Sequence, residues 1–388
     1  LGLRDALIAA NPAAEKRFIV RAGRLCEVPM KPPAFLASKI LPLSDKLRVL
    51  AEPFARARPP GDESVFDFAK RRIGRGAAEI LVDAMVTGIY GGDQSALSLR
   101  SAFPRMDELE RQYGSLIRAQ IALAKGARSA KRAVGAPTGK LHSFRRGLGE
   151  LIAALATRAE TRTRSNVMTI SKDDARGFVI EGEGEAVRAD AVVVAIPAYE
   201  VARIARSIVP HTLADRVADI PYAPIAVVVE GWDVRALSRA PEGFGFLAPH
   251  VESREILGSI FASSVFPEHA PRGAFMARTM LGGARRPELA TLEATALVER
   301  ADRELEALLG FAMPKDCAVR EIFRFERGIP QYNLGHAEKV AAADAIERDV
   351  PGLFVTGNAF RGVAMIACIV DAERVAERVV ASIGRTVG

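Results

Sequence analysis

The stretch PGLFVTGNAFRGVAM, from Pro351 to Met365, decides the fold of this chain. Its apolar strand, Leu353–Val355, stops at Gly357 and Asn358, and a short loop then leads into a helical sequence. A helix N-terminus offers free backbone N–H groups and the positive end of the helix dipole, so it favours anionic oxygens. Glycine in such a loop lets a bulky ligand approach the backbone, because no Cβ stands in the way. Taken alone, the pattern fits any strand–loop–helix of an α/β protein equally well.

Seven further sequence blocks lie in a fixed order along nearly the whole chain. They are ESVFDFAKRRIG (Glu63–Gly74), GIYGGDQSALSLRSAFP (Gly88–Pro104), SFRRGLGELIAALA (Ser143–Ala156), GFGFLAP (Gly243–Pro249), LGSIFASSVFPEHAP (Leu257–Pro271), TMLGGARRPEL (Thr279–Leu289) and IPQYNLGHAEKV (Ile329–Val340). Together with the C-terminal stretch they resemble the blocks of the protoporphyrinogen and coproporphyrinogen oxidases, in the FAD-dependent amine-oxidase-like superfamily. One such block would be weak evidence, but eight in one order are specific.

The resemblance implies an α/β fold with α+β elements. We expect a split, Rossmann-like FAD-binding domain, a substrate domain built on a mixed sheet, and a helical insertion that could associate with a membrane. The expected segments are 1–28 (the remaining start of the FAD and substrate domains), 29–142 (helical insertion), 143–220 (middle FAD-binding segment), 221–330 (substrate-binding sheet) and 331–388 (C-terminal FAD-binding segment).

The family opens with a strand–GxGxxG–helix unit, whose glycines hold the FAD pyrophosphate. The only comparable match here begins at Gly243, and Pro249 follows at once, so no helix can start there. Leu1 resembles a point of the family sequence after that unit. We therefore expect either a shortened chain or a protein that has lost half its cofactor site. A polypeptide beginning at Leu1 should bind FAD weakly or not at all.

Composition bounds the remaining possibilities. A chain of 388 residues should form two domains, since single cores stop growing at roughly 250–300 residues. The three cysteines are odd in number and far apart, which favours reduced thiols and a cytoplasmic location. The net charge of +7 suits an acidic small molecule or an anionic membrane surface. Nucleic-acid binding is not expected, because aromatic and basic residues do not alternate in the chain, and neither His nor Cys shows metal-ligand spacing.

Three local predictions concern the helical insertion and the strand that precedes Pro197. Leu43, Leu47, Leu50 and Phe54 follow helical spacing beside basic residues, so they predict an amphipathic helix, and residues 106–125 predict one long helix. The stripe either packs inside the insertion or, with the basic segment 125–146, contacts anionic membranes at the inner face of the cell membrane. The run of apolar residues at 191–196 predicts a buried strand.

The resemblance also suggests which residues bind the cofactor, FAD. The candidates lie in the C-terminal stretch and in one earlier strand: Val167, Gly357, Asn358, Gly362, Val363, Ala364 and Met365. In the family the residues after the second glycine lie against the ribityl and pyrophosphate groups. Many members continue with Asn-Asp where this chain has Ile366 and Ala367, which weakens the polar contact expected there. No side chain is identified as catalytic.

For the substrate, Phe244, Gly245, Leu247 and Met280 match positions that line the tetrapyrrole pocket in relatives. A planar apolar macrocycle needs aromatic and aliphatic walls, although ordinary sheet packing explains these residues about as well. A basic residue should hold a propionate. Some relatives place an arginine near residues 29–36. The aligned position here resembles Pro33, so Lys31 or Lys39 would have to substitute.

The preferred hypothesis is a flavoenzyme of heme biosynthesis that oxidises protoporphyrinogen IX or coproporphyrinogen III to the porphyrin with FAD and oxygen. The alternative is a porphyrin-binding or interaction protein that has lost FAD and hence catalysis. The sequence does not choose between the two porphyrinogens. It does not fix the oligomeric state either, for which a homodimer is one expectation.

Overall fold

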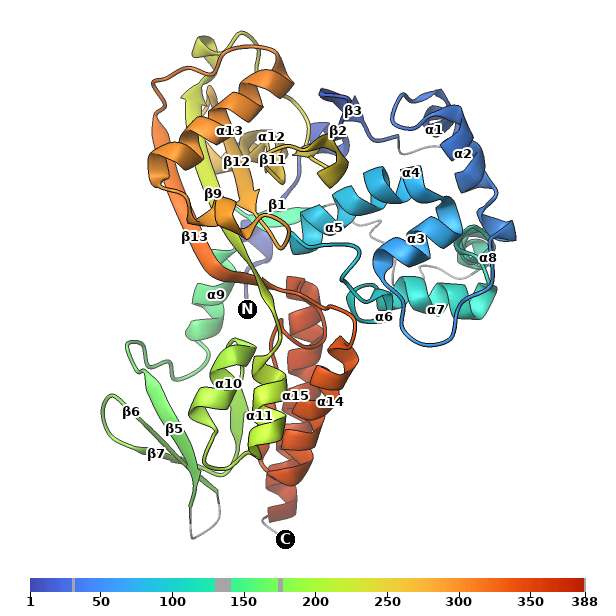
Figure 1. Cartoon of the computed structure of the whole chain (residues 1–388). Coiled ribbons are helices and arrows are strands. Elements are labelled where there is room, and N and C mark those ends of the chain that lie inside the picture. The colour runs from blue at the N-terminus through green and yellow to red at the C-terminus, as the bar shows by residue number, and fades with distance from the viewer. Residues whose placement is uncertain (30–31, 130–140, 174–176, 387–388) are drawn as a thin grey trace. The chain divides into compact units, whose positions relative to one another are not determined.

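The computed structural model describes residues 1–29, 32–129, 141–173 and 177–386, and it divides the chain into two compact units (Figure 1). Unit 1 comprises residues 1–95, 105–160 and 223–328. Unit 2 comprises residues 96–104, 161–222 and 329–388. Each unit therefore contains segments that are far apart in the sequence, as the split domain organisation requires. None of the described helices is long and apolar enough to cross a membrane.

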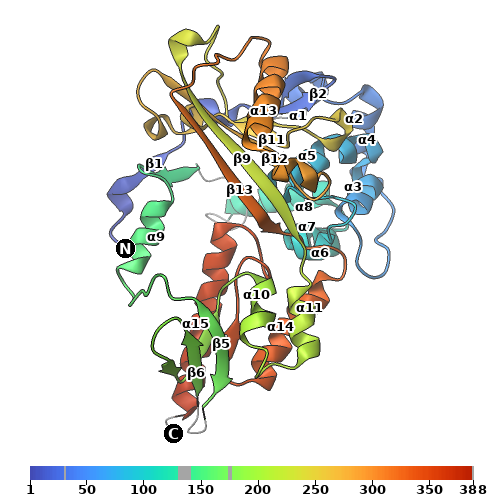
Figure 2. The same ribbon diagram turned by 60° about the vertical axis from the view of Figure 1, so that its left-hand side comes forward.

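A seven-stranded mixed sheet is the framework of unit 1. Its strand order is β13-β9-β12-β11-β10-β2-β3. Strands β10 and β2 are parallel, whereas β9 with β12, β12 with β11, β11 with β10, and β2 with β3 are antiparallel pairs. The strands are β2 (Arg17–Arg21), β3 (Arg24–Glu27), β9 (Tyr222–Asp233), β10 (Gly245–Leu247), β11 (Gly258–Ile260), β12 (Ala274–Gly282) and β13 (Val319–Pro330). The long strands β9 and β13 run side by side along one edge of the sheet (Figure 2). The expected mixed sheet is thus present.

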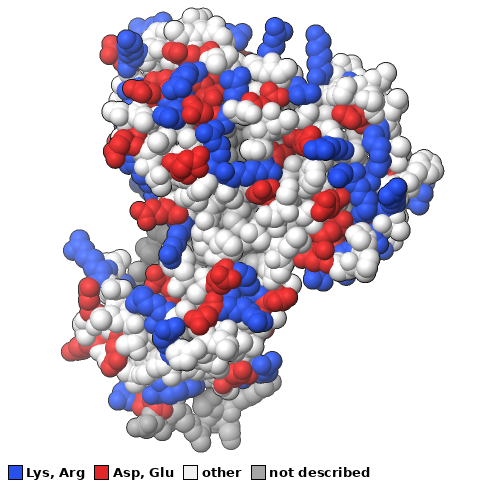
Figure 3. Space-filling view, in the orientation of Figure 1, with Lys and Arg blue, Asp and Glu red and all other residues white. Residues whose placement is uncertain are grey.

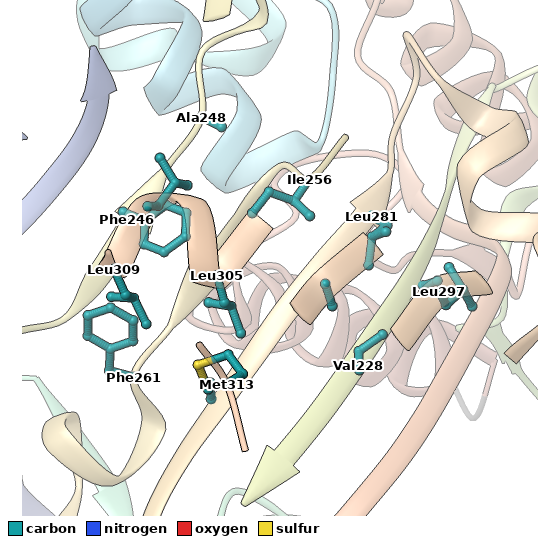
Figure 4. Close-up of a cluster of buried hydrophobic side chains, with 14 of the residues drawn as sticks. Val228, Phe246, Ala248, Ile256, Phe261, Leu281, Leu297, Leu305, Leu309 and Met313 are labelled. Atoms are coloured by element: carbon teal, nitrogen blue, oxygen red, sulfur yellow. The ribbon is translucent and has the colours of Figure 1, made fainter. Parts of the chain in front are cut away.

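One face of this sheet is buried beneath helix α13 (Ala294–Leu309). Leu297, Ala301 and Leu305 recur every fourth residue, so they form one apolar stripe along the helix, and all three are fully buried. They pack against side chains of the sheet such as Val228 and Leu281 (Figure 4). Each large side chain buried in this way contributes about 1.5–3 kcal/mol relative to an exposed one. This packing leaves the opposite face of the sheet for other contacts.

Most of the remaining helices of unit 1 come from the predicted insertion. The helices of unit 1 besides α13 are α1 (Pro32–Ala37), α2 (Leu43–Leu50), α3 (Val65–Ile73), α4 (Arg75–Ala77), α5 (Asp83–Tyr90), α7 (Pro104–Tyr113), α8 (Leu116–Ser129), α9 (Gly149–Ala156) and α12 (Ala262–Val265). The prediction of one helix over 106–125 is wrong, because the structure has two separate helices there, α7 and α8. Gly114 adopts φ +66°, which ends α7, and the Ser115 hydroxyl accepts the N–H of Arg118 at 3.1 Å and so caps α8.

Unit 2 combines a parallel strand pair, a three-stranded antiparallel sheet and five helices among its described residues. The strands are β8 (Val192–Val194) with β14 (Leu353–Val355), and β5 (Val167–Lys172), β6 (Phe178–Gly182) and β7 (Val187–Ala189). The helices are α6 (Leu99–Ala102), α10 (Ala198–Ile204), α11 (His211–Ala218), α14 (His336–Asp349) and α15 (Met365–Thr386). A second buried apolar cluster, which includes Ile170, Val194, Ile346 and Val355, holds these elements together.

Two features differ from the sequence-based expectations. Residues 143–160 were expected in the FAD-binding domain, but they cluster with unit 1, where β4 (His142–Phe144) pairs with β1 (Leu7–Ala9). The strand predicted to be fully buried at 191–196 is also partly open. Val193 is 44% exposed, because among the described strands β8 pairs only with β14.

Candidate functional site

The loop that follows β14 is the centre of the candidate site, and it lies wholly in unit 2. Its first residue, Thr356, donates its backbone N–H to the carbonyl of Val194 at 3.0 Å. The hydrogen bonding between β14 and β8 therefore continues into the first residue of the loop. The Thr356 hydroxyl donates to Asp371 of α15 at 2.5 Å. Arg361 forms an ion pair with Asp344 of α14. These contacts tie the two ends of the loop to two helices.

Tyr332 holds the middle of the loop. Its hydroxyl donates to the carbonyl of Asn358 at 2.6 Å and accepts the N–H of Gly362 at 2.8 Å. The ring of His336 stacks on the Tyr332 ring with centroids 4.0 Å apart, and His336 Nε2 lies 3.2 Å from the carbonyl of Phe360. Tyr332 was not predicted from the sequence as part of the site. The only signal was its spacing of four residues from His336 in the block IPQYNLGH.

His336 is buried in its neutral form beneath the loop. Burial lowers its pKa to about 4, and the hydrogen bond to Phe360 offsets this only in part. With Nε2 donating to that carbonyl, Nδ1 is left as an acceptor, and within the described chain it has no partner. The side chain therefore positions the loop and is not suited to exchange protons near neutral pH.

The stability of unit 2 should consequently depend on pH. Because the folded-state pKa of about 4 lies below the ordinary 6.5, the unfolded chain takes up the proton first. The free energy of unfolding should fall as the pH drops from about 6.5 to 4, by roughly 3 kcal/mol in all. Urea unfolding of the parent and of His336→Gln across this range measures the effect. Equal pH dependence of the two proteins would contradict it.

The N-terminus of α15 stands open immediately after the loop. Ala364 precedes the helix and its carbonyl accepts the N–H groups of Ala367 and Cys368, so Ala364 is the N-cap residue. Ala364 is exposed, and Met365 and Ile366 are 49% and 66% exposed. The first-turn N–H groups of a 22-residue helix thus meet no covering side chain from these positions. This arrangement suits an anionic group with an apolar neighbour.

The two glycines of the loop have different roles. Gly357 adopts φ +124°, and a Cβ built there would have Ile196 O, at 3.9 Å, as its nearest neighbour. The space in front of Gly357 is therefore free for a ligand. A Cβ on Gly362 would instead lie 2.4 Å from the Cβ of Ala367. Gly362 is required for packing of the loop on α15, so its replacement by valine would disturb the protein rather than block a ligand selectively.

Val167, the candidate from the earlier strand, begins β5 and is half-buried. Its backbone carbonyl accepts a hydrogen bond from the Arg203 guanidinium at 3.2 Å. Arg203 also forms an ion pair with Glu200, so the carbonyl of Val167 already has a local partner. A backbone contact from Val167 to a cofactor stays a prediction.

The structure brings three of the substrate candidates onto neighbouring strands of unit 1. Leu247 of β10 lies opposite Gly258 of β11, which in turn lies opposite Met280 of β12. Residues in register on adjacent strands point to the same face, so Leu247 and Met280 share one face of the sheet. Phe244 directly precedes β10, and its ring lies 5.2 Å from the Arg17 guanidinium.

Gly245 is required by the packing of two strands of the sheet. It adopts φ +126°, and a Cβ there would lie 2.1 Å from the carbonyl oxygen of Ser259 on β11. The close approach is thus between two strands. Lys31, the candidate for binding a propionate, lies outside the described residues. Within the described ranges no group of three His, Cys, Asp or Glu side chains could hold a metal ion.

The residues of unit 2 fit one part of an elongated cofactor. The open space before Gly357 accepts a bulky group, and the exposed first turn of α15 accepts an anionic one. The two positions lie at the two ends of one short loop, and the Tyr332 hydroxyl contacts both Asn358 and Gly362, so one elongated molecule can use both. Asn358, Val363, Ala364 and Met365 lie between or beside them. Acidic and basic side chains intermix over the visible face of each unit (Figure 3). That face therefore carries no large, purely basic surface that would be an alternative binding place for an anion.

Comparison with known proteins gives a consistent picture. The family model described as flavin containing amine oxidoreductase matches residues 1–380. Chloroplastic protoporphyrinogen oxidases of Oryza sativa and Nicotiana tabacum are 32% and 30% identical, over 97% and 99% of this chain and 74% of their own length in each case. The coproporphyrinogen III oxidase of Staphylococcus aureus is 27% identical over 96% of this chain and 80% of its own.

Solved structures show the same fold. A protein of Exiguobacterium sp. 255-15, for which protoporphyrinogen oxidase activity has been proposed, matches with a TM-score of 0.78 and 22% identity. The match covers 97% of this chain and 82% of that protein. Reduced UDP-galactopyranose mutase matches with a TM-score of 0.65 and 15% identity, over 92% of this chain and 75% of the mutase.

Proposed function

Since the chain belongs to the family of flavin-containing amine oxidoreductases, we propose that it oxidises a porphyrinogen to the porphyrin with FAD and oxygen, a step of heme biosynthesis. The observation that carries the proposal is the agreement among relatives. Plant relatives at 30–32% identity are protoporphyrinogen oxidases, and bacterial relatives at 27–28% are coproporphyrinogen III oxidases. The matches span nearly all of this chain.

Unit 2 contributes residues that would hold the cofactor. Gly357 and Asn358 leave room beside the loop, and Val363, Ala364 and Met365 present the N-terminus of α15 to the anionic part of FAD. Tyr332 and His336 fix the loop from beneath. When bound, FAD supplies the oxidising power: it takes up hydride equivalents from the porphyrinogen and passes electrons to oxygen, releasing peroxide.

Unit 1 would bind and orient the substrate. Met280 gives its sheet an apolar side chain, Leu247 on the same face packs against the buried cluster of the helical region, and Phe244 stands at the start of β10. Apolar walls suit a tetrapyrrole ring, and they exclude water from the carbon atoms that are oxidised. We assign no side chain as a general base.

Conversion of the colourless, non-fluorescent porphyrinogens to fluorescent porphyrins tests the proposal. The purified protein supplied with FAD should form porphyrin and peroxide faster than the spontaneous oxidation in a blank without protein. Porphyrin binding without faster oxidation would favour the alternative function, a porphyrin-binding protein without flavin chemistry. Activity on neither porphyrinogen would contradict the proposed function.

We further propose a peripheral contact of unit 1 with the cell membrane. The predicted stripe does not pack inside the helical region: Leu43, Leu47 and Leu50 are 66%, 56% and 48% exposed, and Phe54 is 86% exposed. Lys46 of the same helix is buried instead and donates to the carbonyl of Leu36 at 2.8 Å. Helix α2 thus turns its leucines outward, as interfacial helices do. A cytoplasmic protein at the inner membrane face, and a homodimer, stay predictions.

Vesicle co-sedimentation should show this contact. Replacing both Leu47 and Phe54 by serine should remove most lipid-dependent pelleting, because each exposed apolar group buried in lipid adds to binding. Val251→Ser, which alters an apolar residue elsewhere in unit 1 that is about as exposed as Leu47, is the control. Salt should weaken vesicle binding only modestly, because the Lys46 and Arg48 side chains already donate hydrogen bonds to backbone carbonyl groups of the protein. Residues 130–140 of the basic segment lie outside the described residues. No pelleting of the parent at any salt concentration would contradict the proposal.

A further inference from the structure

Two arginines lie in one row across the face of the unit 1 sheet that is opposite α13, beside the part of that face which the helical region covers at Ile19 and Leu247. The strand registers place Arg17 opposite Gly245, Gly245 opposite Ile260, and Ile260 opposite Arg278. These residues belong to β2, β10, β11 and β12 in turn, which are neighbouring strands of the sheet. Since neighbours in register point to the same face, Arg17 and Arg278 stand on one face with a glycine and an isoleucine between them.

The position of Arg278 is unusual for a charged side chain. Strand β12 is an interior strand of the sheet, and its odd-numbered residues from Phe275 to Leu281 are buried beneath α13. Arg278 points the other way and is exposed. Among the described residues its guanidinium has no hydrogen bond and no ion pair. A guanidinium held in the middle of a sheet face without a carboxylate is available to bind an anion.

Arg17 provides a comparable group at the other end of the row. It is exposed, and its only recorded side-chain contact within the described residues is with the ring of Phe244. Three strand spacings separate Arg17 from Arg278, roughly 14 Å. Between them Gly245 is buried and Ile260 is half-buried, so neither adds a polar side chain. The row therefore has the form of an apolar floor with a cation at each end.

We propose that Arg17 and Arg278 bind carboxylates at opposite edges of the substrate, and that the protein consequently prefers coproporphyrinogen to protoporphyrinogen. The inference rests on the proposed function and deepens it. Coproporphyrinogen carries a propionate on every pyrrole ring, so acid groups lie on both edges of the macrocycle. In protoporphyrinogen the two propionates occupy neighbouring rings and share one edge. Only the first substrate engages both arginines at once.

Binding of the stable porphyrins tests the inference apart from flavin chemistry. Fluorescence titration with coproporphyrin III should give tighter binding than titration with protoporphyrin IX. Arg278→Gln should weaken coproporphyrin binding about 10-fold or more, the loss expected for one charged hydrogen-bonded contact. Arg17→Gln should act in the same direction, and Arg278→Lys should restore part of the loss. Arg272→Gln, an exposed arginine just before β12, is the matched control and should bind like the parent.

The outcomes separate this inference from the proposed function. Porphyrinogen oxidation by the parent, together with unchanged coproporphyrin binding in Arg278→Gln, would overturn the role of the arginines and leave the function standing. Equal binding of both porphyrins by the parent would overturn the substrate preference. A parent that neither binds porphyrins nor oxidises porphyrinogens would contradict both. Circular dichroism of each variant shows whether the fold is retained.

Discussion

Replacing Ala364 by aspartate should weaken FAD binding on the order of 30-fold while leaving the fold intact. Ala364 is the exposed N-cap of α15, and aspartate is among the best N-cap residues, so the helix itself should become slightly more stable. The new carboxylate would, however, face an anionic part of the cofactor. Two negative charges about 6 Å apart at an effective dielectric near 20 repel by roughly 3 kcal/mol, which reduces affinity by about two orders of magnitude at most.

Ala364→Asn is the matched control, because asparagine caps the helix equally well and carries no charge. Flavin fluorescence titrations of the parent and both variants, with thermal unfolding curves alongside, give the answer. Equal affinity for FAD in Ala364→Asp and Ala364→Asn would show that no anion lies at this N-terminus. Gly362→Val cannot make the same test, since its side chain would collide with Ala367.

Replacing Glu52 by alanine should destabilise unit 1 by about 3–5 kcal/mol, as removal of one partner from a buried ion pair does. Glu52 and Arg72 are 1% and 2% exposed, and Arg72 Nε donates to Glu52 at 2.7 Å. The carboxylate also accepts the Ser115 hydroxyl at 2.5 Å and the Leu116 N–H at 3.0 Å. Burial opposes its ionisation, but these hydrogen bonds lower the pKa of Glu52 overall. Without Glu52 the start of α8 and the Arg72 guanidinium lose their shared partner.

Chemical denaturation of Glu52→Ala beside Glu79→Gln measures the effect. Glu79 forms an ion pair with Arg75, which is largely exposed, so its loss should leave the free energy of unfolding almost unchanged. Similar small changes in both variants would show that the buried network around Glu52 does not support the helical region.

The strand–loop–helix at the C-terminus was predictable from sequence, because its signals are local. The glycines, the apolar strand and the helical spacing after Gly362 all lie within one short stretch. Tyr332 was not predictable, since its contacts with Asn358 and Gly362 join positions that are 26 and 30 residues away. The role of Gly362 depends likewise on the position of Ala367 against the loop.

Which face of the amphipathic helix α2 meets the protein was not predictable either. The spacing of Leu43, Leu47 and Leu50 correctly indicated a helix, but spacing does not say which face meets the protein. Here Lys46 faces inward because carbonyl groups of Leu36 and Ser38 accept its hydrogen bonds. The row from Arg17 to Arg278 depends on strand register, which is absent from a single sequence.

Anaerobic mixing of the protein, supplied with FAD, and a porphyrinogen tests the central claim most directly. Without oxygen, electrons that leave the substrate must remain on the flavin, so the visible flavin absorbance should bleach while porphyrin fluorescence rises in step. Admission of air should restore the absorbance and produce peroxide. Coproporphyrinogen should bleach the flavin faster than protoporphyrinogen at equal low concentration. A flavin that stays oxidised in the presence of either porphyrinogen would contradict the account.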